Sequence, residues 1–287
     1  MFEAQTPDTS NLPSWATVVL AIAAALVVMV SNAEKILSGL RRMLSMLRPT
    51  ARAELLERRR LLAESLALHV SQNSPQGWSD KNFTELEAQV QIELSPRFWH
   101  RRNAEPDTKL VDSLTSGLIH CNARIIYLEG RPGAGKSVAL RHLANAWAQK
   151  AGSSLRYPIP LYLNLRRLDR KGMEIDRTLI ERFVRAEIRT INHPDVEEFL
   201  AKDFHQWCRD GHLLFLFDSF DELKDVLGST ESDEVIGKYI KALEAFAKVQ
   251  SKCRMIVASR SFRGPRRAGW AHFYLQPLST ARRVDFI

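Results

Sequence analysis

The feature that most constrains the fold is residues 130–137, which read GRPGAGKS and match the pattern G-x-x-x-x-G-K-[ST]. The residues before it, 124–129, include β-branched and aromatic side chains and predict a buried strand. The residues after it, 138–147, are apolar at helical spacing and contain no helix breaker. A strand, a glycine-rich loop and a helix in this order predict an α/β fold with a parallel sheet.

The chemistry of this loop suits a bound phosphate. Glycines allow backbone conformations that a side chain would forbid, so successive N–H groups can point at phosphate oxygens, and the helix adds its positive N-terminal end. Lys136 is expected to reach the β- and γ-phosphates of a nucleotide, and the Ser137 hydroxyl to hold Mg²⁺. A chance glycine turn is the alternative, and the regular flanks argue against it. The predicted nucleotide-binding residues are Gly130, Arg131, Pro132, Gly133, Ala134, Gly135, Lys136, Ser137 and Val138.

Acidic residues follow a second apolar run. Residues 213–217 read LLFLF and predict a buried strand, which leads directly into the sequence DSFDE. We expect Asp218 to offer a carboxylate ligand to nucleotide-bound Mg²⁺, opposite Ser137. Asp221 or Glu222 is then expected to orient or deprotonate an attacking water. The alternative is a helix N-terminus that carries acids because its dipole favours them.

Three more strands are predicted, which gives a parallel sheet of five, flanked by helices, over about residues 105–287. They cover residues 159–164, 253–260 and 272–275. The second of them ends in Arg260, whose cation is expected to sense the γ-phosphate. The alternative is an arginine that serves only solubility at a strand end. Helical patterns occupy residues 175–190 and 196–209.

The N-terminal region predicts a membrane segment. Residues 9–33 contain no charged side chain and residues 15–30 are almost continuously apolar, close to the roughly 20 residues that span a bilayer. Acidic residues precede this segment and basic residues follow it. The N-terminus is therefore expected outside and the rest in the cytoplasm, as a single-pass protein, at the inner membrane if the source is bacterial. A cleaved signal peptide and a buried hydrophobic helix are the alternatives, and the acidic flank argues against the first.

A basic connector is expected between the membrane segment and the α/β domain. Between Lys35 and Arg60 there are eight Lys/Arg and two Glu residues. Residues 35–48 predict an amphipathic helix that rests on anionic lipid headgroups. A second predicted helix, residues 51–70, includes the arginine triplet 58–60. The alternative to lipid contact for these two helices is a solvated arginine face, with the helix packed on the globular domain.

The composition is that of an ordered protein in a reducing compartment. Hydrophobic residues make up 45% and charged residues 26%, which is enough for a packed core. The three cysteines are odd in number and widely spaced, so they predict neither disulfides nor a metal site. The predicted organisation is a tail and transmembrane helix (1–33), the connector (34–80), a helical lead-in segment (81–123) with a helix over 108–119, and the α/β domain (124–287).

Four segments, in this order, resemble the NACHT type of STAND NTPase, the regulatory P-loop ATPases of innate-immune receptors and their bacterial relatives. They are YLEGRPGAGKS (127–137), IPLYLNLRRL (159–168), LLFLFDSFDEL (213–223) and RMIVASR (254–260). The most diagnostic part is DSFDE. The resemblance covers about residues 105–287 and does not extend to the predicted membrane segment or connector.

The resemblance implies a nucleotide site and a sheet order. The strand before Arg260 is placed between the loop strand and the Asp218 strand, which brings Arg260 to the phosphates. Family members normally continue into a helical lid, a winged-helix domain and a sensor array, so a truncated C-terminus is expected here. By position, the family roles are phosphate binding of ATP or ADP at Gly130–Ser137, Mg²⁺ coordination at Ser137 and Asp218, and hydrolysis at Asp221 or Glu222.

Three functions are compatible with these features. The preferred one is a membrane-anchored regulatory ATPase, which binds ATP and Mg²⁺, hydrolyses ATP slowly, and forms homo-oligomers as a switch under an unidentified trigger, in bacterial antiviral defence. The second is a nucleic-acid motor or loader whose arginines hold the phosphate backbone. The third is a nucleotide-binding scaffold that hydrolyses nothing. The position of the basic connector beside the membrane segment argues against a nucleic-acid partner.

Overall fold

The computed structural model describes residues 49–72, 88–91, 108–111, 113–191, 193–229, 232–250, 252–265 and 269–276. The predicted membrane segment and the predicted helix over residues 35–48 lie outside them. Within the described ranges, no helix is both long enough and apolar enough to cross a bilayer. The chain divides into two units, Met1–Leu55 and Leu56–Ile287. Of the first unit only Pro49–Leu55, the start of helix α2, is described, and all that follows concerns the second.

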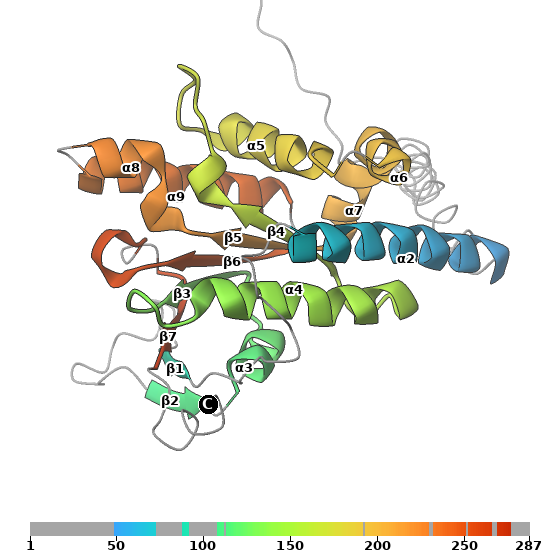
Figure 1. The fold of residues 1–287 in the computed structure, drawn as a ribbon, viewed down its shortest axis with the longest axis horizontal. Helices are drawn as coiled ribbons and strands as arrows, with labels where there is room; N and C mark the ends of the chain where they lie inside the picture. The colour runs from blue at the N-terminus through green and yellow to red at the C-terminus, as the bar shows by residue number, and fades with distance from the viewer. Residues whose placement is uncertain are drawn as a thin grey trace, which may run out of the picture. The chain divides into compact units, whose positions relative to one another are not determined.

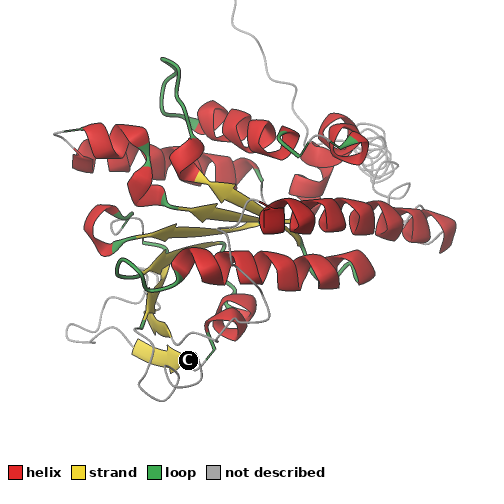
Figure 2. Ribbon diagram, in the orientation of Figure 1, coloured by secondary structure: helices red, strands yellow, loops and turns green. Residues whose placement is uncertain are grey.

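The described residues of the second unit form a seven-stranded sheet in the order β2-β1-β7-β3-β6-β5-β4 (Figures 1 and 2). All pairs among β7, β3, β6, β5 and β4 are parallel, which confirms the five predicted parallel strands. Strand β6 lies between β3 and β5, as the resemblance implies. The strands are β1 (Ala88–Gln91), β2 (Thr108–Val111), β3 (Ile125–Glu129), β4 (Ile159–Asn164), β5 (Leu213–Asp218), β6 (Arg254–Ser259) and β7 (Ala271–Leu275).

The predicted helical lead-in segment is partly wrong. Residues 108–111 form strand β2, and the helix α3 begins only at Leu114, after Ser113 caps its first turn by accepting a hydrogen bond from the Ser116 N–H. Strand β1 pairs antiparallel with β7 and with β2, so the sheet has two more strands than the five predicted. The physical reason is non-local. The free edge of β7 offers unpaired backbone groups, and pairing with it overrides the weak local preference of two four-residue segments.

Helices cover both faces of the sheet (Figure 1). Strand β5 is buried along its whole length, as expected of a parallel strand covered on both sides. Its alternate residues Leu214 and Leu216 belong to the core cluster that includes α3 and α4, and Phe215 contacts Phe246 of α9 with ring centroids 5.2 Å apart. The helices are α2 (Pro49–Gln72), α3 (Leu114–His120), α4 (Lys136–Ser153), α5 (Arg177–Arg189), α6 (Pro194–Glu198), α7 (Phe204–Asp210), α8 (Lys224–Gly228) and α9 (Ser232–Val249).

The predicted helix over residues 196–209 has a π-helical turn, Phe199–Asp203, between α6 and α7. Phe199 packs against the rings of Phe204 and Trp207 at centroid distances of 5.9 and 5.2 Å. Gly211 ends α7 in the left-handed conformation, with φ of 81°, which favours glycine. This turn matters because it forms one wall of the surface on which α2 packs.

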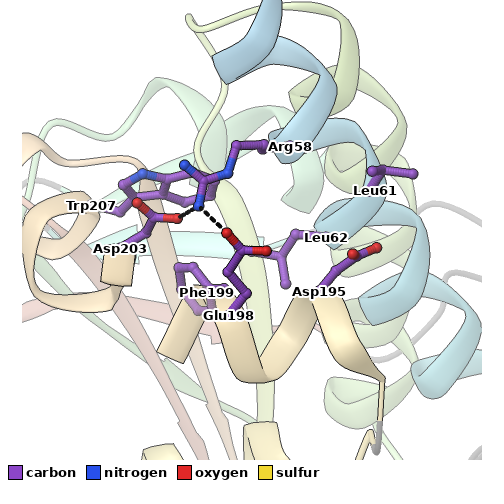
Figure 3. Close-up of a pocket in the computed structure, with 8 residues that line it drawn as sticks. All are labelled: Arg58, Leu61, Leu62, Asp195, Glu198, Phe199, Asp203 and Trp207. Atoms are coloured by element: carbon purple, nitrogen blue, oxygen red, sulfur yellow. Dashed lines mark hydrogen bonds and ion pairs between the residues drawn. The ribbon is translucent and has the colours of Figure 1, made fainter. Parts of the chain in front are cut away.

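Two of the three consecutive arginines of α2 contact the α/β domain, and Figure 3 shows the first of them, Arg58. Arg58 forms ion pairs with Asp203 and, at 3.7 Å, with Glu198. Arg59 is 0% exposed. It donates to the Tyr157 carbonyl at 2.5 Å and lies over the Trp207 ring. The helix thus packs on the globular domain, as the alternative interpretation expects, but Arg59 is buried and not solvated.

Helix α2 approaches α4 closely at Gly152. A Cβ at Gly152 would lie 3.2 Å from the Arg60 Cα, a backbone atom that cannot turn aside. Four apolar residues of α2 are also buried: Leu62, Ala63, Leu66 and Val70. From Leu56 onward, α2 is thus part of the α/β domain, although its sequence reads as a basic connector.

Candidate nucleotide-binding site

The phosphate-binding loop has the geometry that its glycines predict. Strand β3 ends at Glu129 and α4 begins at Lys136. Gly133 and Gly135 have φ of 75° and 89°, a left-handed region that side chains disfavour. Gly130 is constrained differently, since a Cβ there would lie 3.1 Å from the Leu275 Cβ. Two of these glycines therefore adopt a left-handed conformation, and the third allows a close approach to Leu275.

A cleft of about 260 Å³ lies between this loop and the carboxyl ends of β5 and β6. The edge of a parallel sheet where strands end is the usual ligand site of such folds. The cleft contains every predicted site residue except Gly130 and Arg131, whose carbonyls contact Lys136. It is lined by Pro132, Gly133, Ala134, Gly135, Lys136, Ser137, Val138, Asp218, Ser219, Asp221, Glu222 and Arg260.

Lys136 is held inside the loop. Its Nζ donates to the carbonyl oxygens of Gly130 at 2.7 Å and Arg131 at 3.1 Å. Burial lowers the pKa of Lys136, and the carboxylates of Asp221 and Asp218 oppose that shift. A cation with so little access to water is stabilised by an added anion. The loop therefore presents a partly desolvated ammonium group to whatever phosphate enters the cleft.

Asp218 is fixed by hydrogen bonds to both carboxylate oxygens. Oδ2 accepts from the Tyr162 hydroxyl at 2.6 Å and Oδ1 from the Ser219 N–H at 2.8 Å. Ser219 has φ of 60°, a left-handed conformation that is costly for a residue other than glycine. Strain of this kind is a feature of functional turns.

The oxygen atoms of Ser137 and Asp218 suit Mg²⁺. Both residues line the cleft, and a hydroxyl and a carboxylate are hard oxygen ligands of the type that this ion takes. Among the described residues, no cluster of three His, Cys, Asp or Glu residues could hold a metal ion by itself. That fits Mg²⁺, which usually binds through one or two protein oxygens together with substrate phosphates and waters.

Arg260 joins the two remaining acids. Its N–H and Nε contact Asp221 at 2.9 and 3.2 Å, and its Nη2 donates to Glu222 at 2.8 Å. Asp221 is only 7% exposed and also accepts from the Ser259 hydroxyl. The Glu222 side chain is 25% exposed and faces Arg166 at 3.8 Å. The geometry therefore separates two acids that the sequence left equivalent: Asp221 holds Arg260, and Glu222 is the more accessible carboxylate.

Sequence reasoning missed Tyr162 and the backbone role of Ser219. Tyr162 lies in β4, opposite Leu216 and diagonal to Asp218 in the ladder. Long side chains reach across such diagonals. A tyrosine within the otherwise apolar run around residues 159–163 is the signal that was available, but it has meaning only once the pairing of β4 with β5 is known.

Comparison with known proteins agrees with this site. A family model described as the NACHT domain matches residues 124–287. The chain belongs to the NACHT family. NACHT, LRR and PYD domains-containing protein 14 of Homo sapiens is 30% identical over 130 residues, which cover 45% of this chain and 11% of the human protein. The chain thus spans about a tenth of the length of this relative.

Membership of the NACHT family indicates the general function of the cleft. Residues 124–287 form a nucleotide-binding regulatory NTPase domain of the STAND type, and NACHT domains bind nucleotide, generally with Mg²⁺. The matched range contains the loop, the DSFDE turn and Arg260, so the NACHT match and the cleft concern the same residues.

Proposed function

We propose that this protein is a membrane-anchored regulatory ATPase, in which binding and slow hydrolysis of ATP control self-association. The observation that carries the proposal is the cleft in which the phosphate-binding loop meets Asp218, Asp221, Glu222 and Arg260. These residues come from three separate regions of the chain, and a nucleotide with its Mg²⁺ is a ligand that uses all of them.

Each residue then has a distinct role. The loop N–H groups and Lys136 bind the phosphates, while Ser137 and Asp218 hold Mg²⁺, which neutralises phosphate charge when bound. Glu222, the more accessible acid, accepts a proton from the attacking water. Arg260 stabilises negative charge that develops on the γ-phosphate. For this it must turn from Glu222 toward the phosphate, so nucleotide binding competes with the ion pair of Arg260 and Glu222.

The nucleotide proposal is tested by ATP binding and phosphate release on the full chain. We expect saturable ATP binding that Mg²⁺ strengthens, with turnover slower than the ~10 s⁻¹ typical of enzymes. Binding without turnover would favour the scaffold. Failure to bind any nucleoside triphosphate would overturn the proposal. Oligonucleotide binding with a steep salt dependence would favour the motor, but Arg58 and Arg59 are already engaged in protein contacts.

The membrane part of the proposal rests on the apolar residues 15–30 and the basic residues that follow them. Because α2 belongs to the α/β domain from Leu56 onward, a membrane anchor at residues 15–30 would be separated from that domain by only a short stretch of chain. Self-association in the plane of the membrane would then bring NTPase domains together. We place this switch in bacterial antiviral defence on the strength of the family resemblance.

The full chain is expected to sediment with membranes and to resist extraction by high salt and by alkaline carbonate. Deletion of residues 12–33 is expected to release it into the soluble fraction. A charge variant, Arg41→Ala with Arg42→Ala, is the control, because loss of electrostatic attraction leaves a spanning segment in place. Release of the parent chain by salt alone would contradict a spanning helix and favour surface attachment.

A further inference from the structure

We propose that Tyr162 is a positioning residue for the metal ligand Asp218, and that it links this carboxylate to the helix of the phosphate-binding loop. The inference rests on the proposed function, because it concerns the Mg²⁺ that accompanies the nucleotide. Neither the family match nor the sequence pattern assigns a role to this tyrosine.

The first step is the geometry of the Asp218 carboxylate. The Tyr162 hydroxyl donates to Oδ2 at 2.6 Å, and the Ser219 N–H donates to Oδ1 at 2.8 Å. A carboxylate oxygen accepts at two lone pairs, so each oxygen keeps one position for a cation or a bound water. With one donor on each oxygen, the plane of the carboxylate is fixed before a metal arrives.

The second step is what holds Tyr162. Its ring lies under the guanidinium group of Arg141, whose Cζ is 5.3 Å from the ring centroid. Such a cation over an aromatic ring is attractive. The cation over the ring and the hydrogen bond from the hydroxyl to Asp218 together hold the Tyr162 side chain in place.

The third step is the connection to the loop. Arg141 is in α4, the helix that begins at Lys136 and continues through Ser137. The contacts thus run from α4 through Arg141 and Tyr162 to Asp218, and they join the two elements that supply the proposed Mg²⁺ ligands. A donor that orients a ligating carboxylate typically changes metal affinity by about 10–100-fold when it is removed.

The test compares nucleotide binding with and without Mg²⁺ in the full chain carrying Tyr162→Phe. The probe is a fluorescent, slowly hydrolysed ATP analogue. Its affinity in EDTA is expected to stay within about twofold of the parent, because the loop contacts are unchanged. The Mg²⁺ concentration that gives half-maximal strengthening of binding is expected to rise about tenfold. Arg141→Met removes the cation over the ring. This variant is expected to raise the same Mg²⁺ concentration, but less than Tyr162→Phe does.

Tyr239→Phe is the matched control. The Tyr239 hydroxyl donates to Asp225 Oδ2 at 2.7 Å, so this variant also loses a tyrosine-to-aspartate hydrogen bond, but Asp225 does not line the cleft. Both variants are expected to lose similar thermal stability, and only Tyr162→Phe to change the Mg²⁺ dependence.

The outcomes separate this inference from the proposed function. If the parent binds the analogue with Mg²⁺ dependence and Tyr162→Phe shows the same or tighter Mg²⁺ dependence, Tyr162 does not position Asp218. If Tyr162→Phe does not fold, the Mg²⁺ dependence of Arg141→Met is used instead, and a dependence equal to that of the parent contradicts the inference. A parent chain that binds no nucleotide would overturn the proposed function together with this inference.

Discussion

Lys136→Ala is expected to weaken ATP binding about a hundredfold or more. The Lys136 ammonium is half-buried in the loop, where it donates hydrogen bonds to the carbonyls of Gly130 and Arg131. A buried charge that pairs with an opposite charge is worth about 2–5 kcal/mol when one partner is removed, and about 3 kcal/mol corresponds to a hundredfold change in affinity. Titration calorimetry or a fluorescent ATP analogue measures this loss.

The control for Lys136 lies in the same helix. Lys150 is exposed in the last turn of α4, with its Nζ 5.7 Å from the centre of the Tyr157 ring. Lys150→Ala removes the same charge from the same helix and is expected to leave ATP affinity within about threefold of the parent. Stability without nucleotide is expected to change little in Lys136→Ala, because burial already disfavours that ammonium. Equal ATP affinity in Lys136→Ala and the parent would contradict the assignment of the loop.

Glu222→Gln is expected to slow ATP hydrolysis by about 10²–10⁴-fold, the range that general-base catalysis contributes, while ATP still binds. Glu222 is the more accessible acid of the cleft, and the amide cannot take a proton from water. Phosphate release under saturating ATP measures kcat, and binding of the analogue measures affinity separately. Glu244→Gln is the control, since Glu244 accepts a hydrogen bond from Trp270 outside the cleft.

Asp221→Asn is expected to lower stability, whereas Glu222→Gln is expected to slow hydrolysis. This difference tests the distinct roles assigned to the two acids. Asp221 accepts from Arg260 and Ser259 and is buried, so its loss is expected to lower the free energy of unfolding by about 1–3 kcal/mol. Urea unfolding measures this change. If Asp221→Asn left stability unchanged and Glu222→Gln lowered it, the assignment of the holding acid and the catalytic acid would be reversed.

The local parts of the site follow from the sequence because their requirements are local. A left-handed glycine, a lysine at the start of a helix and an apolar strand that ends in a carboxylate depend on neighbouring residues only. The five predicted parallel strands, the loop at 130–137 and the acids at 218–222 therefore occur in the structure close to where the sequence places them. The predicted strand order also holds, through the family resemblance and not through spacing.

The errors arise where partners are distant in the chain. The sequence predicts a helical segment where β1 and β2 lie, because their residues show little preference of their own, and the edge of β7 gives them strand structure. The arginine triplet suggested a lipid-facing helix, but Arg58 and Arg59 find protein partners near residues 198–207 and at the Tyr157 carbonyl. The pattern of charged residues along a helix does not predict whether that helix faces lipid or protein.

The sequence by itself determined the phosphate-binding loop, the parallel strands and the acidic turn of this NACHT domain, because backbone conformation and hydrophobic pattern are read from adjacent residues. Only the tertiary structure decided that Asp221 holds Arg260 while Glu222 is more accessible, that Tyr162 contacts Asp218, and that α2 belongs to the domain from Leu56 onward. Each of these contacts joins residues far apart in the chain. Pairing of strands and packing of helices that are distant in the chain create these contacts, and neighbouring residues alone do not specify such partners.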